Sequence, residues 1–242
     1  MVMDFDFTLL GEVPAPKSFM VRREFRGVGS FKLTVQRDAG GLLARDRVIY
    51  RPDRPEQGWI IHRVSRSGDT LTVDGTPLKG LAKRRICLPP LITGGAYNQF
   101  GYDLFTGDAE SAYLHFAANN LTAPEDAARA IPRLVLDTNL HRGPELPWQA
   151  RFEKLSDLFE DIGAATEAGW DIRPDFGAKR YVFGAWAGVD RTTGTGRCAL
   201  SRELGNVEGG SVTEDAGSAV TVVYAGGAGE DDAADEVTRH AC

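Results

Sequence analysis

Residues 19–35 read FMVRREFRGVGSFKLTV, in which two short runs of alternating apolar and polar residues flank a glycine-rich turn. The apolar positions of both runs recur with a period of two, which is typical of β-strands with one buried face. They are Phe19, Val21 and Phe25 in the first run and Phe31, Leu33 and Val35 in the second. Because the turn Gly27-Val28-Gly29-Ser30 separates the runs, the segment predicts a β-hairpin.

The rest of the first 90 residues continues this pattern. Residues 58–66 and 70–73 predict a second hairpin around Ser67-Gly68-Asp69, and Asp74-Gly75 marks the next expected turn. Val48 and Tyr50 belong to a further strand. Short strands at regular spacing predict a small β-barrel or sandwich.

The pattern changes after residue 90. Pro89-Pro90 and Gly94-Gly95 punctuate the chain, and apolar residues then recur with a helical period. We therefore expect a domain boundary near residue 92, with a β-barrel-like domain over 1–92 and an α+β domain over 93–194. Residues 106–118 predict a helix capped by Thr106 or Asp108.

Two further helical signals lie in this middle segment. Pro124, followed by Glu125 and Asp126, suits the first turn of a helix. The clearest helix is expected over residues 148–168, with Gly169 as its end. Its apolar stripe consists of Phe152, Leu155, Leu158, Phe159 and Ile162. Strands at 170–174 and 181–186, joined by 175–178, complete a β-rich α+β fold.

The C-terminal part carries weaker signals. A polar Thr/Gly stretch at 192–196 precedes a partial second β-domain expected over 195–229, with a short strand at 220–224. Residues 220–229 resemble the strand and glycine turn of a dinucleotide site, but no βαβ unit follows, so a plain turn is expected. Residues 230–242 hold five acids and one arginine and predict a solvated tail.

Composition excludes several protein classes. The 242 residues are 42% hydrophobic and 26% charged, which is ordinary globular usage, and disorder is not expected as the main state. No apolar run is long enough for stable membrane insertion, and the first ten residues lack the features of a secretory signal. The odd number of cysteines, Cys87, Cys198 and Cys242, favours neither a disulfide framework nor a zinc site.

Charge is distributed unevenly along the chain. The net charge is −6, yet residues 1–100 hold 16 Lys+Arg against 10 Asp+Glu, and residues 101–242 hold 12 against 24. Specific nucleic-acid binding is not expected from an acidic chain, and would need the basic N-terminal part alone. Opposite-sign regions suit head-to-tail or ring assembly, because complementary surfaces steer partners into register.

No constellation in the sequence predicts catalysis, a cofactor or a metal. The long helix carries four acidic residues that could supply the paired carboxylates of a glycosidase, namely Glu153, Asp157, Glu160 and Asp161. They are better explained as the solvent-exposed face of that helix. The four histidines, His62, His115, His141 and His240, are isolated in sequence and are expected to be structural or exposed.

The one candidate site is a basic cluster just before Ile86. Lys79, Lys83, Arg84 and Arg85 could face solvent, contact phosphates or contact an acidic neighbour, and we favour an intersubunit contact.

Seven segments in order resemble the tail-tip hub (minor tail) proteins of phages with long non-contractile tails. In the first half they are residues 19–33, 58–64 and 73–86, the last fitting loosely the family's Gly-x-x-Leu-x-x-x-x-Arg segment. In the second half they are 155–163, 170–173, 181–183 and Gly188-Val-Asp-Arg-Thr-Thr193. The likeness extends over roughly residues 5–229.

This resemblance implies a structural baseplate-hub protein, located in the virion at the tail tip and made in the host cytoplasm. It implies a homotrimeric ring below the tail tube, in which two β-domains per chain imitate six-fold symmetry. The implied partners are other copies of the chain, the tail tube, the distal tail and the tape-measure protein.

The sequence departs from the family's pattern at Gly226 to Gly229, where further strands of the second β-domain are expected but residues 230–242 follow. Either the domain is abbreviated, or the sequence is truncated or frame-shifted there. Two other functions stay open: a tail-associated cell-wall hydrolase, and a carbohydrate-binding or adaptor β-module.

Overall fold

A computed structural model describes residues 1–13, 16–36, 41–91, 97, 100–194, 197–207, 214, 222–225 and 238–241. The chain divides into two units, Met1–Val189 and Asp190–Cys242. The first unit contains most of the described secondary structure and is a β-rich α+β fold.

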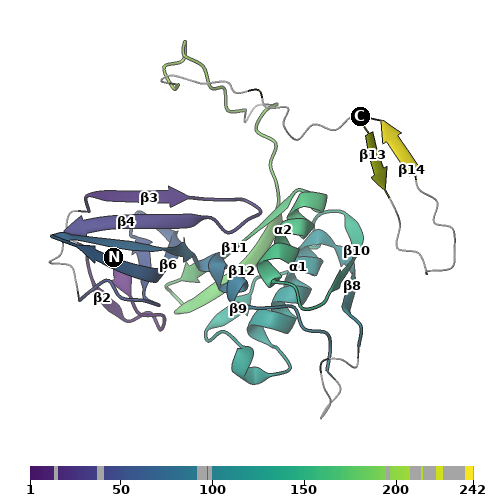
Figure 1. The fold of residues 1–242 in the computed structure, drawn as a ribbon, viewed down its shortest axis with the longest axis horizontal. Helices are drawn as coiled ribbons and strands as arrows, with labels where there is room; N and C mark the ends of the chain where they lie inside the picture. The colour runs from purple at the N-terminus through teal and green to yellow at the C-terminus, as the bar shows by residue number, and fades with distance from the viewer. Residues whose placement is uncertain are drawn as a thin grey trace. The chain divides into compact units, whose positions relative to one another are not determined.

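A seven-stranded antiparallel sheet forms the N-terminal part of the first unit (Figure 1). Its spatial order is β2-β1-β5-β6-β7-β4-β3, so β2 and β3 are the edges, and the sheet is open rather than a closed barrel or a sandwich. In this order the strands span Leu9–Gly11, Val2–Met3, Val48–Arg51, Arg54–Ser67, Thr70–Pro77, Ser30–Gln36 and Ser18–Arg22.

Both predicted hairpins are confirmed. β3 pairs with β4, bringing Phe19 opposite Leu33, and β6 pairs with β7 around Ser67-Gly68-Asp69. Figure 1 shows the sheet curled, with β3 and β4 above and β2 below. Alternate side chains from its strands meet Leu43, which precedes β5, in one apolar cluster. The strand residues of this cluster are Val2, Phe31, Leu33, Val35, Ile49, Trp59, Ile61, Leu71 and Val73.

The predicted turn at Asp74-Gly75 is wrong, because both residues lie inside β7. Gly75 pairs with Phe31 on one side and Ile61 on the other. A Cβ atom at Gly75 would lie 1.9 Å from the carbonyl oxygen of Ile60 and 2.5 Å from the Phe31 ring. Glycine is therefore needed here for the close approach of two strands.

The remainder of the first unit combines helices with two small sheets. β8 (Asp103–Asp108) pairs antiparallel with β10 (Glu145–Ala150). In the second sheet β12 (Arg180–Ala187) lies between β11 (Ala168–Asp175) and β9 (Leu134–Leu136), antiparallel to β11 and parallel to β9. The other elements are η2 (Leu78–Arg84), α1 (Ala109–Ala117), η3 (Ala118–Thr122), η4 (Ala127–Arg129) and α2 (Leu155–Thr166).

The first predicted helix of this part exists but is shorter than expected. α1 begins at Ala109, because Asp108 caps it by accepting a hydrogen bond from the backbone N–H of Ser111 at 2.8 Å. Pro124 does not open an α-helix. Instead, Asp126 accepts from the N–H of Ala128 at the start of the short 3₁₀ turn η4.

The predicted start of the long helix at Trp148 is also wrong. Trp148 lies in β10, and α2 begins at Leu155. Between them, the Phe152 N–H donates to the carbonyl of Cys87 at 2.7 Å, and the Leu155 N–H donates to the carbonyl of Arg85 at 2.9 Å. These long-range backbone bonds hold Phe152 at φ +60° with 47% of its surface exposed, outside the apolar stripe. The other four stripe residues, Leu155, Leu158, Phe159 and Ile162, are buried as expected.

Gly169 does not end this helix. α2 ends at Thr166, and the next residue, Glu167, caps it in the left-handed conformation at φ +57°. Gly169 lies in β11, where a Cβ atom would come within 2.3 Å of the Phe25 ring. The predicted strand pair that follows is confirmed as β11 and β12.

One core joins the seven-stranded sheet to the helical part. Met3, Val48 and Ile60 from the sheet belong to the same buried cluster as Phe159 and Trp170. Distant polar groups reinforce the contact: the Tyr181 hydroxyl donates to the carbonyl of Phe5 at 3.0 Å, and the Trp170 indole donates to the carbonyl of Arg26 at 2.7 Å. The expected boundary near residue 92 falls within this unit. Residues 92–96 lie outside the described residues, so the boundary stays a prediction.

In the second unit, β13 (Val222–Ala225) pairs antiparallel with β14 (Thr238–Ala241). The expected strand at 220–224 overlaps β13, whereas Gly226 to Gly229 lie outside the described residues.

Candidate functional site

The four residues of the predicted basic cluster do not share one surface. Lys79 is buried, with 3% of its surface exposed, in the 3₁₀ helix η2. Its ammonium group donates to the backbone carbonyls of Glu24 at 2.9 Å, Phe25 at 3.3 Å and Trp170 at 3.0 Å. Lys79 is thus an internal cation rather than part of a surface patch, which corrects the expectation from sequence.

The Lys79 environment is unusual for an amine. Burial lowers the pKa of Lys79 to about 8, against the opposing charges of Asp171 and Glu24. Three carbonyl acceptors satisfy the ammonium group, and the Trp170 ring centroid lies 4.7 Å from it.

Arg84 lies at the surface and is held by two partners. One Nη donates to Asp46 Oδ1 at 3.0 Å and lies 3.0 Å from His62 Nδ1. Because Nδ1 faces a guanidinium, it accepts, and Nε2 of the same ring then donates to the Thr76 hydroxyl at 2.8 Å. Burial lowers the pKa of His62, and the charges of Arg84 and Lys83 lower it further, while Asp46 acts in the opposite direction.

Arg85 is half-buried and is bound to backbone acceptors. Its Nε and one Nη donate to the carbonyl of Arg129 at 3.0 and 2.8 Å. Arg129 in turn donates to the carbonyl of Ile86 at 2.8 Å. With Lys83 exposed, the surface part of the basic cluster consists of Lys83, Arg84 and Arg85.

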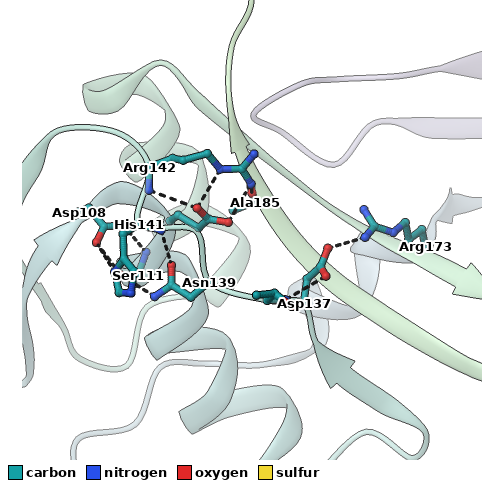
Figure 2. A network of polar contacts seen from close by, with 10 residues as sticks. Asp108, Ser111, Asp137, Asn139, His141, Arg142, Arg173 and Ala185 are labelled. Carbon is teal, nitrogen blue, oxygen red and sulfur yellow. Dashed lines mark hydrogen bonds and ion pairs between the residues drawn. The ribbon is translucent and has the colours of Figure 1, made fainter.

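A second polar network fixes the segment that follows β9 (Figure 2). Arg142 binds the buried carboxylate of Glu110 through Nε at 2.9 Å and an Nη at 2.8 Å, and the same Nη donates to the carbonyl of Ala185 at 2.8 Å. Asp137 pairs with Arg173 at the other end of the segment. Residues 137–142 are therefore tied to α1, β11 and β12.

Ser111, His141 and Asp108 meet within this network, which is a set of residue types used in nucleophilic catalysis (Figure 2). The geometry is that of a helix cap. Ser111 Oγ donates directly to Asp108 Oδ2 at 2.6 Å, and His141 Nδ1 lies 3.2 Å from both oxygens. In a catalytic triad the imidazole stands between the hydroxyl and the carboxylate. Burial would raise the pKa of Asp108, but hydrogen bonds from Ser111 and the contact with His141 hold it below its usual value.

The histidines are less isolated than the sequence indicates. His115 Nε2 lies 2.8 Å from Asp103 Oδ1, and Asn119 donates to the other oxygen of that carboxylate at 2.9 Å. His141 contacts Asp108, 33 residues away. His240 lies in β14. In the part of the chain that the structure describes, no group of three or more His, Cys, Asp or Glu side chains is placed to hold a metal ion.

The remaining sequence candidates are solvent-facing or inert. Asp157, Glu160 and Asp161 are exposed on α2, and burial raises the pKa of half-buried Glu153. Burial also raises the pKa of the Cys87 thiol to about 12, whereas Cys198 is exposed. Among the described helices, none has the length and apolarity to cross a membrane.

Comparison with known proteins gives a family match and a structural likeness. Residues 1–239 match the model of the family described as Siphovirus ReqiPepy6 Gp37-like protein. The crystal structure of prophage tail protein gp18 from Listeria monocytogenes EGD-e is similar over 75% of this chain and 49% of that one, with 11% identity and a TM-score of 0.47. The chain thus spans about half the length of that protein. None of the curated proteins compared with the chain matches it.

Proposed function

The chain belongs to the Siphovirus ReqiPepy6 Gp37-like family, and from this premise we propose that it is a structural protein of a siphovirus tail. The observation that carries the proposal is the family match over residues 1–239. The order of hub-like segments over residues 5–229 supports the same role. Function then consists of binding neighbouring subunits in the virion.

More specifically, we propose a baseplate hub at the tail tip, which joins the tail tube to the distal, host-facing components and contacts the tape-measure protein. The chain forms a homotrimeric ring, to which a partial second β-domain over 195–229 contributes. Light scattering of the purified chain tests the trimer, with an expected mass of about three times the 26.3 kDa protomer. A monomer at every concentration, and also in the presence of isolated tail tubes, contradicts it.

Lys83, Arg84 and Arg85 form the basic side of the subunit interface in this proposal. Arg84→Glu combined with Arg85→Glu reverses two charges and weakens incorporation into tails, most strongly at low salt, where screening is least. Arg66, an exposed arginine at the end of β6, supplies the matched control Arg66→Glu. If the doubly reversed chain enters virions and supports infection as well as wild type, these residues do not form the interface.

Location and role are tested in the virion. Gold-labelled antibody against the chain is expected at the tail tip, and an amber mutation in its gene is expected to yield particles without complete tails. Complete, infectious tails made without the chain contradict a structural role.

The hydrolase alternative rests on the carboxylates of α2, of which Glu160 and Asp157 face solvent. A zymogram with host cell wall decides it: clearing by wild type that disappears in Glu160→Gln replaces the structural proposal with an enzymatic one. Specific hits on a glycan array from a monomeric chain support a carbohydrate-binding module instead.

A further inference from the structure

Arg84 and Arg85 both line a pocket of about 250 Å³ in the first unit. Its apolar wall combines residues from distant parts of the chain, namely Phe5, Ile60, Leu81, Ile131 and Pro132. Its polar residues are Asp46, Arg84 and Arg85. We call this the arginine pocket. An apolar wall beside charged groups is the arrangement of a site for an amphipathic group.

Both guanidinium groups are fixed before any partner arrives. Arg84 is held between Asp46 and His62, each at 3.0 Å, and Arg85 donates twice to the carbonyl of Arg129. A fixed guanidinium loses little side-chain freedom when it binds an anion, so these contacts pre-organise the pocket.

Positive charge is in excess around the arginine pocket. Lys83 and Arg129 adjoin Arg84 and Arg85, and Asp46 is the one carboxylate among the lining residues that the structure describes. Burial lowers the pKa of Arg85, and the neighbouring charges of Arg129 and Arg84 lower it further. A carboxylate entering the pocket would relieve this repulsion.

We propose that the arginine pocket binds an acidic segment of a neighbouring protein subunit, in which a carboxylate side chain lies next to a leucine-sized apolar side chain. The carboxylate binds Arg84 and Arg85, and the apolar side chain fills the space against Ile131 and Leu81. This inference rests on the proposed function only in that the partner is another protein of the particle.

The size of the pocket favours a peptide anchor. A volume of about 250 Å³ lies below the usual range of sites that enclose a whole small molecule, but it suits one buried side chain.

Nucleic acid is disfavoured as the ligand of this pocket, because single strands bind through stacking on free aromatic faces. The aromatic residue in the lining, Phe5, already packs on Tyr181, with ring centroids 4.4 Å apart.

The test uses the full chain and a fluorescein-labelled pentapeptide, Glu-Glu-Leu-Glu-Glu, followed by fluorescence anisotropy. Two matched peptides separate the contribution of the apolar side chain from that of the carboxylates. One has Ser in place of Leu, and the other has Gln in place of every Glu. We expect the parent peptide to bind about tenfold tighter than either. Equal binding of the Ser peptide overturns the apolar subsite, and equal binding of the Gln peptide overturns the role of the arginines.

Protein variants provide the second arm. Arg84→Gln is expected to weaken binding of the parent peptide about tenfold, and the matched control Arg66→Gln to leave it within about twofold. Equal losses in both variants, or displacement of the peptide by oligo-dT at equal concentration, overturn the proposal. If Arg84→Gln does not fold, the comparison of the three peptides on the wild-type chain still tests the proposal. Tails that assemble without the chain refute the structural role and leave the peptide result unaffected, so the two failures are distinguishable.

Discussion

Lys79 Nζ donates to the backbone carbonyl of Trp170 at 3.0 Å and lies 4.7 Å from the centroid of that residue's ring. One residue of β11 therefore attracts the ammonium group in two ways. The other two acceptors, the carbonyls of Glu24 and Phe25, lie in the connection between β3 and β4. The buried ammonium group of Lys79 thus connects the β3–β4 hairpin of the large sheet to the three-stranded sheet that contains β11.

Lys79→Met is expected to lower the free energy of unfolding by about 3 kcal/mol, because it leaves buried carbonyls without donors. Chemical denaturation measures the change. Exposed Lys83 provides the control, since Lys83→Met is expected to cost no more than about 0.5 kcal/mol. Equal effects of the two substitutions would show that the carbonyl contacts of Lys79 contribute nothing.

His62 is expected to make stability fall as the solution becomes acidic. Its pKa is lowered in the fold by burial and by the charges of Arg84 and Lys83, despite Asp46. As pH falls through about 6.5, the unfolded chain therefore takes up a proton before the folded chain does, which favours unfolding. The loss continues until the folded imidazole is itself protonated. Denaturation between pH 7.5 and 5 should show a shallower pH dependence for His62→Gln, and an unchanged dependence contradicts the assignment.

Leu158 and Phe152 are expected to contribute very differently to stability, although both fit the same helical spacing. Leu158→Ala removes a buried side chain from α2 and should cost about 2–5 kcal/mol. Phe152→Ala removes a side chain that is 47% exposed and should cost less than about 1 kcal/mol. Thermal melts of the two variants compare them directly, and a larger loss for Phe152→Ala would contradict this packing.

Arg142→Ala is expected to cost about 1–3 kcal/mol, because it leaves the carboxylate of Glu110, which is 3% exposed, without its charged partner. Replacing both residues, Glu110→Leu with Arg142→Leu, should recover part of that loss, since no unpaired buried charge remains. A double variant less stable than Arg142→Ala would contradict this account.

Limited digestion tests the boundary near residue 92. Residues 86–128 contain no lysine or arginine, so chymotrypsin is the suitable protease, with Tyr97 and Phe100 as the expected first sites. The two fragments should co-elute under native conditions, because the core joins residues on both sides of the cut. First cuts at Phe19 or Phe25 would contradict the boundary.

Local signals account for what the sequence predicts correctly. The hairpin of Phe19 and Leu33 needs only alternation and a turn, and the Asp108 cap lies three residues from its partner Ser111. The errors arise where distant segments override such signals. Phe152 fits a helical stripe, yet its backbone is bound to Cys87, and Gly75 looks like a turn residue but is required by the approach of Phe31 and Ile60.

Contacts between distant residues also explain the error at the candidate site. Sequence proximity groups Lys79 with Arg84, but the carbonyl partners of Lys79 lie 54 to 91 residues away, and no pattern of spacing indicates them. The division of charge at residue 100 does not match the two structural units either. Residues 1–189 carry 24 Lys+Arg and 24 Asp+Glu, so the first unit is neutral and the net charge of −6 belongs to residues 190–242.

The hydrogen bond from the Tyr181 hydroxyl to the carbonyl of Phe5 spans 176 positions of the chain. During synthesis at roughly 5–20 residues per second, Phe5 leaves the ribosome about 10–30 s before its partner is made. Throughout that interval the apolar residues around Met3 lack the strands and helix that later cover them. The large sheet is thus without its apolar cover during that interval, and its edge strands β2 and β3 are where premature association is most favoured.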